Sequence, residues 1–327
     1  MGVLGTGISA LAAAHYVKKA GFDVTVLDVD SGSARPGKTF SYNGCRFDQF
    51  SQPIAESDTE SLAFLRDLGI GAELQWHGTN FGRNFFWPKW RKHKVATCAG
   101  LSQSIEQALR TDLAVDHAAR AIDLLEFDHC IELRTDRRRR AFDAIITTLS
   151  LDEVDDVARG LLAQEIPGNR YRPLTLANVV FITPTPLFKK YTTFVAANRQ
   201  PFCWVSSTTD VESQLTAIHV CGYSEMPPLE LKLLATRFLC QNYSEFQPSL
   251  VREVQVFQSP EGVPLNRPIP ARVGETRLFL ASRELGCVAP MSINTDLILA
   301  KGAVAELLEC APIFACGARQ VAHAAGR

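Results

Sequence analysis

The feature that most constrains this chain is the succession of apolar strand, glycine-rich turn, helix and second strand within its first 28 residues. The turn has the pattern G-x-G-x-x-A, from Gly5 through Gly7 to Ala10, and Asp28 ends the second strand about 20 residues later. The first glycine makes the turn, the second lets a pyrophosphate approach the backbone, and the alanine lets helix and strand pack closely. The helix N-terminus offers N–H groups to phosphates, and the acid accepts hydrogen bonds from a ribose. We therefore predict a dinucleotide-binding domain of the Rossmann type.

Two other interpretations of the N-terminus fit less well. Gly2 and Thr6 match a myristoylation pattern, and the apolar start resembles a secretory leader. A leader carries its positive charge before the apolar stretch, whereas Lys18 and Lys19 follow it here. The carboxylate of Asp28 also repels a 2′-phosphate, so FAD or NAD is favoured over NADP.

Charge and cysteine content limit the kind of partner. The 34 Lys and Arg residues nearly balance the 35 Asp and Glu residues, so no overall field favours nucleic acid or an anionic membrane. Nine cysteines occur without a CxxC pair, which is typical of reduced thiols in a cytoplasmic protein. No apolar run reaches the roughly 18–20 residues of a membrane span, and no histidines have metal-ligand spacing. We expect a cytoplasmic protein with a small-molecule substrate, no metal, no nucleic acid and no membrane, and of unknown oligomeric state.

Apolar spacing predicts the main elements of secondary structure. Helices are expected at about 8–20, 58–68, 101–110, 151–163, 228–243 and 294–309. Strands are expected at 177–183, 192–197, 217–223 and 251–257, which would form a mostly antiparallel sheet.

The residues after Asp28 resemble a known family. The stretch VDSGSARPGKTFSYNGCRFDQF is similar to the G-G-R-x-x-T-like turn and G-x-x-x-D motif of flavin-containing amine oxidases and their relatives, which include renalase, protoporphyrinogen oxidase and phytoene desaturases. The resemblance implies that Gly37 and Lys38 contact the FAD pyrophosphate. Three positions depart from the family pattern: Pro36 and Phe50 stand where glycines are expected, and Arg283 stands where an acid is expected.

Two later stretches extend the resemblance. Residues 113–148 resemble a three-stranded antiparallel crossover that returns to the nucleotide domain, and residues 277–308 resemble the closing strand and helix. The resemblance implies that the backbone near Ala119 lies beside the adenine and that the closing helix faces the flavin. Together, motif and resemblance give the candidate FAD-binding residues Gly5, Gly7, Ile8, Ser9, Ala10, Asp28, Gly37, Lys38, Ala119, Ser282, Arg283, Ser292 and Ile293.

The family resemblance also implies a division into two domains and an activity. The fold class is α/β, with a discontinuous FAD-binding domain at 1–70, 95–155 and 266–327 and a substrate domain at 71–94 and 156–265. The implied activity is FAD-dependent oxidation of an amine or an unsaturated small molecule by hydride transfer to the flavin. A flavin enzyme without net redox change, similar to a mutase, and a non-catalytic dinucleotide-binding regulatory protein are the alternatives.

The walls of the active site and the catalytic residues are less readable. The flavin-facing wall is expected before Ser292, and the opposite wall among Trp87, Phe202, Trp204 and Tyr223. Aromatic and basic residues alternate over 80–94, a pattern that stacks on single-stranded nucleic acid in some proteins. Because the overall charge is near zero, we interpret this segment as a strand pair that closes a pocket, and Arg137–Arg140 as an exposed hairpin tip.

Overall fold

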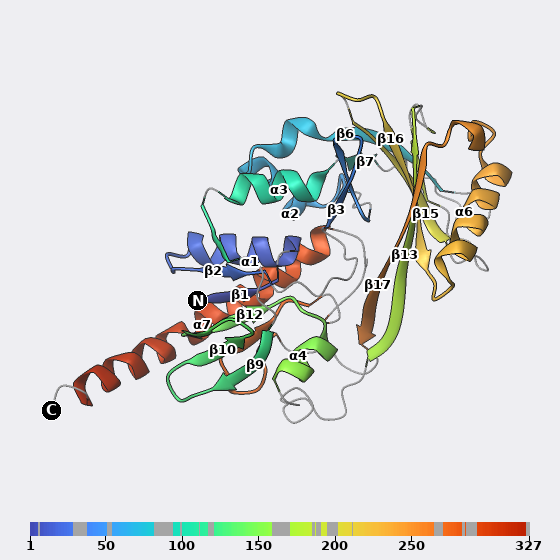
Figure 1. The fold of residues 1–327 in the computed structure, drawn as a ribbon. Coiled ribbons are helices and arrows are strands. Elements are labelled where there is room, and N and C mark those ends of the chain that lie inside the picture. The colour runs from blue at the N-terminus through green and yellow to red at the C-terminus, as the bar shows by residue number, and fades with distance from the viewer. Residues whose placement is uncertain are drawn as a thin grey trace.

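The fold contains a parallel sheet and a larger antiparallel sheet that lie side by side (Figure 1). The computed structural model describes residues 1–5, 7–28, 38–50, 54–81, 94–98, 100–110, 112–116, 121–158, 171–184, 187, 191–194, 202–210, 212–264, 271–282, 285 and 293–324.

The parallel sheet has the strand order β18-β12-β1-β2-β8, and every neighbouring pair is parallel. Its strands are short and buried: β1 (Gly2–Leu4), β2 (Thr25–Leu27), β8 (Ala114–Asp116), β12 (Ile145–Thr147) and β18 (Leu278–Leu280). Side chains alternate between the two faces, so that Val3 packs in one core cluster and Leu4 in the other. A parallel sheet needs such cover on both faces.

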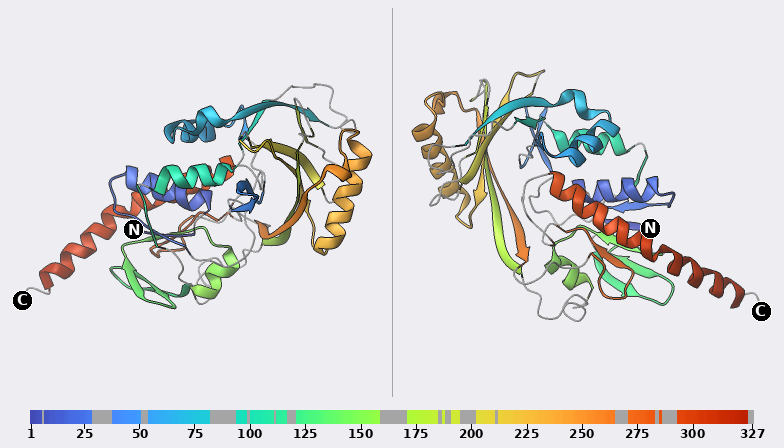
Figure 2. Two further views of the ribbon diagram at one scale, coloured as in Figure 1. Left: turned by 45° about the horizontal axis from the view of Figure 1, so that its top comes forward. Right: turned by 180° about the vertical axis from the view of Figure 1, so that it is seen from behind.

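Helices cover one face of this sheet, and a small antiparallel sheet with a short helix covers the other (Figures 1 and 2). The helical layer consists of α1 (Ile8–Lys19), α2 (Thr59–Asp67) with the 3₁₀ turn η1 (Ile70–Glu73), α3 (Leu101–Arg110) and α7 (Ile293–Ala324). The opposite layer consists of β9 (Ala121–Glu126), β10 (Ile131–Thr135), β11 (Arg139–Phe142) and α4 (Leu151–Val157). The C-terminal part of α7 extends away from the sheet (Figure 1).

The second sheet has eight strands in the order β17-β13-β16-β15-β14-β6-β7-β5. All neighbours are antiparallel except β14 and β6. The strands are β5 (Ile54–Ala55), β6 (Gln75–Phe81), β7 (Lys94–Thr97), β13 (Tyr171–Thr183), β14 (Tyr191–Phe194), β15 (Phe202–Thr209), β16 (Thr216–Tyr223) and β17 (Glu253–Pro264). Helix α6 (Pro228–Asn242), followed by η2 (Pro248–Leu250), packs on the outer face (Figure 2).

A two-stranded hairpin lies against the inner face of the large sheet. It is formed by β3 (Thr39–Tyr42) and β4 (Cys45–Asp48). Phe47 of the hairpin packs with Val180 and Ile182 of β13 in a buried cluster. The face of the eight-stranded sheet opposite α6 is therefore also buried, which makes it an interior surface.

The predicted architecture is confirmed: a parallel sheet, an antiparallel crossover and a mostly antiparallel second sheet are all present. The largest difference in a single element is α7, which runs to Ala324 although the sequence indicated an end near 309. Helix α4 ends at Val157, and residues 159–163 of its predicted range lie outside the described residues. Strand β13 begins at Tyr171, six residues before the predicted start.

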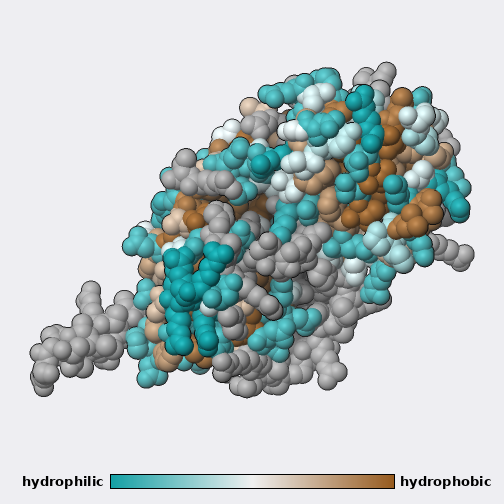
Figure 3. Space-filling model, viewed as in Figure 1, coloured by the Kyte–Doolittle hydropathy of each residue, from teal (hydrophilic) through white to brown (hydrophobic). Residues whose placement is uncertain are grey.

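The hydropathy of the surface differs from one element to the next (Figure 3). The turn between β10 and β11 carries exposed Arg137, Arg138 and Arg139, as expected for a hairpin tip. Hydrophobic side chains gather over α6 and its neighbouring strands, where Leu229 and Leu233 are exposed. Within the described ranges, no helix combines the length and apolar character needed to cross a bilayer.

Candidate functional site

Gly5 makes the turn that leaves strand β1, and its backbone requires glycine. Its φ of +113° lies in the region that residues with a Cβ rarely adopt. A Cβ at this position would lie 2.2 Å from Oγ1 of Thr148, which follows β12 and donates to the carbonyl of Leu4. The turn therefore needs glycine both for its conformation and for the close approach of the neighbouring strand.

Gly7 is the N-cap of α1, and its backbone does not require glycine. Its φ of −67° and ψ of 173° are ordinary extended values. Ser, Thr, Asp and Asn are preferred over Gly at such a position, because their side chains accept hydrogen bonds from the first free N–H groups. Here α1 has no side-chain cap and no acid in its first turn, although Ile8, Ser9 and Ala10 are buried. A buried helix N-terminus without a cap is unusual, and it leaves N–H groups available to an anion.

Asp28 lies directly after β2, beside this turn. The Gly5 amide donates to the carbonyl of Leu27 over 2.9 Å, and the Asp28 amide donates to the carbonyl of Asp116 over 2.9 Å. Arg138 and Arg140 from the crossover sheet form ion pairs with the Asp116 carboxylate, the second at 3.0 Å. The carboxyl ends of β1, β2 and β8 thus lie at the same end of the sheet, with Asp28 after β2 and Asp116 at the end of β8.

The first turn of α7 lies against the first turn of α1. Ile293 begins α7 and is fully buried. The Ser9 hydroxyl donates to Oδ1 of Asp296 over 2.6 Å, and only 2% of the surface of Asp296 is exposed. The Ser9 hydroxyl therefore holds the two helices together, and its backbone N–H is the part of Ser9 that can face a ligand. Ser282 is also buried and follows β18 at the same sheet edge.

The G-x-x-x-D motif ends at the N-terminus of α3. The Asp48 carboxylate accepts hydrogen bonds from the amides of Leu101, at 3.0 Å, and Ser102, at 3.2 Å. Burial raises the pKa of Asp48 to about 6, and the hydrogen bonds from Ser102 and Leu101 oppose this rise. Two positions later, Phe50 fills a buried cluster with Leu176 and Cys221 of the large sheet. The motif thus anchors a helix on one side and the large sheet on the other.

Of the other predicted site residues, Lys38 is described by the structure and four are not. The carbonyl of Lys38 accepts from the Gln49 amide over 2.8 Å, so Lys38 lies at the open end of the β3–β4 hairpin. Gly37, Ala119, Arg283 and Ser292 lie outside the described residues, as do Pro36 and Trp87. The structure brings together Gly5, Gly7, Ile8, Ser9, Ala10, Asp28 and Ile293 at one end of the parallel sheet.

The expected opposite wall is only partly correct. Tyr223 packs beside the cluster of Phe50 on the inner face of the eight-stranded sheet. Phe202 faces outward instead, where its ring lies 5.8 Å from that of Phe238 of α6. The assignment of Phe202 to the pocket was wrong because the register shifts between Phe202 and Trp204, which turns Phe202 to the other face.

The inner face of this sheet carries a polar group that the sequence did not indicate. Asn178 of β13 donates to the carbonyl of Gln49 over 2.6 Å and lies 3.0 Å from Nδ1 of His219. Cys221 donates its thiol to Oδ1 of Asn178 over 2.9 Å. Burial lowers the pKa of His219 to about 3, so the imidazole stays neutral at physiological pH. Asn178 lies on β13, and His219 and Cys221 lie on β16. Only the pairing of these two strands brings the three residues together, so the sequence alone did not indicate the group.

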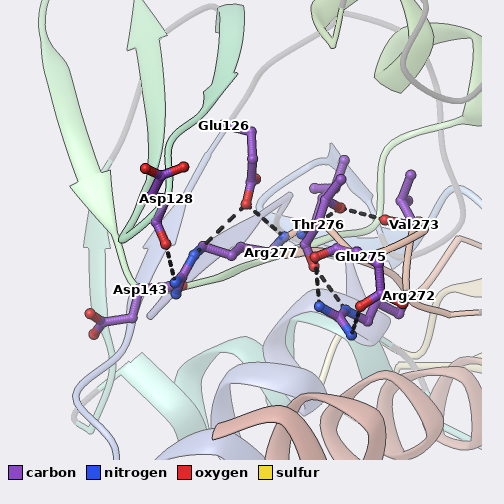
Figure 4. Close-up of polar contacts among 9 residues, drawn as sticks. Glu126, Asp128, Asp143, Arg272, Val273, Glu275, Thr276 and Arg277 are labelled. Carbon is purple, nitrogen blue, oxygen red and sulfur yellow. Dashed lines mark hydrogen bonds and ion pairs between the residues drawn. The ribbon is translucent and has the colours of Figure 1, made fainter. Parts of the chain in front are cut away.

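The opposite edge of the parallel sheet has a structural role (Figure 4). Arg277, which precedes β18, donates to the carbonyls of Asp143, at 3.1 Å, and Asp128, at 2.8 Å. Its Nε lies 3.8 Å from Oε1 of Glu126, and burial raises the pKa of Glu126. These contacts join β18 to the crossover sheet at the amino ends of the strands, away from the carboxyl ends where ligands bind in open α/β sheets. Among the described residues, no group of three or more His, Cys, Asp or Glu could hold a metal ion.

Comparison with known proteins agrees with this geometry. Residues 3–68 match the family of NAD(P)-binding Rossmann-like domains. Protoporphyrinogen oxidase 2 of Arabidopsis thaliana, a chloroplastic and mitochondrial protein, is 33% identical over 73 residues, which is 22% of this chain and 14% of the plant protein. The chain thus matches only a small part of that relative.

Solved structures match over nearly the whole chain. A protein assigned as a protoporphyrinogen oxidase from Exiguobacterium sp. 255-15 superimposes with a TM-score of 0.65 at 11% identity, covering 93% of this chain and 98% of the other. Putrescine oxidase bound to putrescine gives 0.65 at 11% identity, with 94% and 98% covered. p-Nitrophenol 4-monooxygenase from Pseudomonas putida DLL-E4 gives 0.60 at 14% identity, with 94% and 78% covered.

Proposed function

We propose that this chain, which has a Rossmann-like dinucleotide-binding domain and the fold of flavin amine oxidases, binds FAD and oxidises a small organic molecule. The observation that carries the proposal is the N-terminus of α1. Gly7 occupies a cap position where its backbone conformation does not require glycine, and no side chain satisfies the buried first turn. A pyrophosphate explains both facts, because it needs the free N–H groups and the space that a side chain would fill.

Several residues fit the remaining parts of FAD. Gly5, Gly7 and the amides of Ile8, Ser9 and Ala10 would hold the pyrophosphate, and Asp28 would accept hydrogen bonds from the adenosine ribose. A carboxylate at this strand end favours FAD or NAD over NADP, and the likeness of the whole fold to flavin enzymes favours FAD. Ser282 follows β18, and Ile293 begins α7, whose first turn contacts the first turn of α1. Lys38, Gly37, Ala119, Arg283 and Ser292 remain proposed contacts.

The proposed reaction is oxidation of an amine or an unsaturated molecule by hydride transfer. Bound FAD would supply the redox chemistry, and the chain would supply binding, orientation and exclusion of water. The division into an FAD-binding domain and a substrate domain, with the boundaries given above, is part of the proposal. No disulfide is formed by Cys45, Cys98, Cys130, Cys221, Cys240 or Cys310, which supports a cytoplasmic location and a small-molecule substrate rather than a secreted role.

The first test is the visible spectrum of the purified protein. We expect the two absorption bands of oxidised flavin, and release of the chromophore by denaturation should yield FAD. Addition of candidate amines or unsaturated substrates without oxygen should bleach these bands. A colourless protein that does not take up added FAD would contradict the proposal and favour NAD binding or a non-catalytic role.

A substitution at the cap position tests the site itself. Gly7→Asp should lower FAD affinity more than tenfold, because the new carboxylate would cap α1 and repel the pyrophosphate. Gly302→Asp is a matched control, since Gly302 lies within α7 and a Cβ there meets nothing within 4 Å. Equal FAD affinity in the two variants, measured by flavin fluorescence titration, would place the dinucleotide elsewhere.

A further inference from the structure

We propose that Asp296, in the first turn of α7, is a positioning residue for the phosphates of the dinucleotide, because it fixes the first turn of α1 through the hydroxyl of Ser9. This inference rests on the proposed function, since the phosphates are those of the cofactor proposed above. It adds a residue 287 positions away from Ser9 that should control cofactor affinity without contacting the cofactor.

The contact between Ser9 and Asp296 is short and buried. The Ser9 hydroxyl oxygen lies 2.6 Å from Oδ1 of Asp296, a distance typical of hydroxyl-to-carboxylate bonds, which are stronger than bonds between neutral groups. The two residues are only 7% and 2% exposed. Removal of either partner would leave the other buried with one hydrogen bond fewer, so the contact contributes more than a surface hydrogen bond would.

The contact acts on the turn whose amides would hold the phosphates. Ser9 is the second residue of α1, and the helix has no side-chain cap. The amide of Leu11 donates to the carbonyl of Gly7 over 3.1 Å. The amides of Ile8, Ser9 and Ala10 precede this bond and therefore have no acceptor within the helix. Because helix ends fray, an uncapped turn needs tertiary contacts to hold its amides in one direction.

Apolar packing between α1 and α7 is a less directional restraint. The two helices lie side by side (Figures 1 and 2). The buried side chains of α1 include four alanines, which share one cluster with Leu297, Ala300 and Ala303 of α7. Methyl groups allow close approach, but hydrophobic burial has no preferred direction. A hydrogen bond between the two first turns is directional, so it fixes the rotation of α1 against α7.

Fixed amides should bind a pyrophosphate more tightly than amides that must first be ordered. The entropy lost when binding groups are ordered is subtracted from the affinity, and a turn that is already held avoids this loss. Asp296 would act in this way through Ser9, since a carboxylate is itself no ligand for a phosphate. By linkage, a bound pyrophosphate should stabilise the packing of the first turn of α7 to the same extent.

The first experiment compares the FAD affinity of variants by flavin fluorescence titration. Ser9→Ala and Asp296→Ala should each weaken FAD binding about tenfold. Asp296→Asn, which keeps an acceptor for the Ser9 hydroxyl, should bind within about threefold of the native protein. Because both alanine changes break the same bond, the double variant should bind about as weakly as either single variant, and not about a hundredfold more weakly.

Ser61→Ala is the matched control. Ser61 is a fully buried serine of α2, and its hydroxyl lies 3.5 Å from Oδ1 of Asn294 in the same turn of α7. Urea unfolding should show a loss of stability in both serine variants, whereas FAD affinity should fall only in Ser9→Ala. This variant should fold, because alanine is smaller than serine and favours a helix.

Three outcomes would overturn the inference. Native FAD affinity in Ser9→Ala would show that the turn needs no such restraint, and an equal loss of affinity in Ser61→Ala would assign the effect to general stability. A native protein that does not bind FAD would overturn the proposed function and this inference together. The native titration therefore separates the two failures.

The second experiment measures the reciprocal effect by amide hydrogen exchange, with ADP as a probe that carries the pyrophosphate but no flavin. ADP should slow exchange over residues 293–300 in the native protein and in Ser61→Ala. In Ser9→Ala, at an ADP concentration that saturates the variant, this protection should be lost. Protection that persists in Ser9→Ala, or that is absent from the native protein, would show that the phosphates and α7 are not linked through Ser9, and would overturn the inference.

Discussion

Helices α1 and α3 lie in the same layer, but only α3 has a side chain that caps its N-terminus. At α3, the buried Asp48 carboxylate accepts from two backbone amides. At α1, an equally buried first turn begins at a glycine and has no side-chain cap. The chain can therefore supply a buried cap where one is needed, even from a residue 53 positions away. The contrast supports the proposal that the open end of α1 binds a ligand.

The largest expected effect comes from Gly5→Ala. The variant should be destabilised by at least about 3 kcal/mol, because the positive φ and the contact with Thr148 Oγ1 both oppose a methyl group. Gly69→Ala is the comparison, since Gly69 also has a positive φ but a Cβ there meets nothing within 4 Å. Urea unfolding of both variants gives the two costs. Equal costs would mean that backbone conformation alone explains Gly5.

The next effect is the pH dependence that His219 contributes. The pKa of His219 is about 3 in the folded protein and 6.5, its ordinary value, in the unfolded chain. The contribution of His219 to stability is therefore complete above pH 6.5 and is lost as pH falls below that value. Between pH 6.5 and 4 the loss should reach about 3–4 kcal/mol. The measurement is the difference in unfolding free energy between the native protein and His219→Gln at each pH. A constant difference over this range would contradict the burial of a neutral imidazole.

Asp48 should act in the opposite direction and somewhat more weakly. Its folded pKa of about 6 lies above its ordinary value of 3.8, so its stabilising contribution is complete below pH 3.8 and is lost as pH rises through 6. The loss should be about 2–3 kcal/mol. Asp48→Asn, which keeps an acceptor for the α3 amides, should lack this dependence. If the native protein and the variant respond to pH alike, burial does not raise the pKa of Asp48. Asp48 would then cap α3 as a charged carboxylate over the whole pH range measured.

The smallest effects concern substitutions at two helix N-caps, those of α4 and α1. Ser150 and Glu153 form a reciprocal capping box at α4. Ser150→Ala should cost about 1 kcal/mol of unfolding free energy. Gly7→Ser should change the stability of the FAD-free protein by only a few tenths of a kcal/mol in the favourable direction. If Gly7→Ser instead destabilises the FAD-free protein, Gly7 has a structural role and the argument from the open helix end weakens.

The strand, turn and helix at the start of the chain could be predicted from the sequence because they are encoded locally. Gly5, Gly7, Ala10 and Asp28 lie within 28 residues, and each position has one physical requirement. The inner face of the large sheet could not be predicted in this way. Asn178 and His219 meet only because β13 pairs with β16, and one register shift placed Phe202 on the opposite face. The Ser9–Asp296 contact joins residues 287 positions apart, and no local pattern marks it.

The order of the strands has a consequence for how the protein matures. Strand β18 and helix α7 follow the entire eight-stranded sheet in the chain, yet they complete the parallel sheet and meet the first turn of α1. During synthesis, the first turn of α1 therefore cannot meet its partner, Asp296, until the eight-stranded sheet and β18 have been made. The dinucleotide site proposed above is therefore complete only once the first turn of α7 has been made.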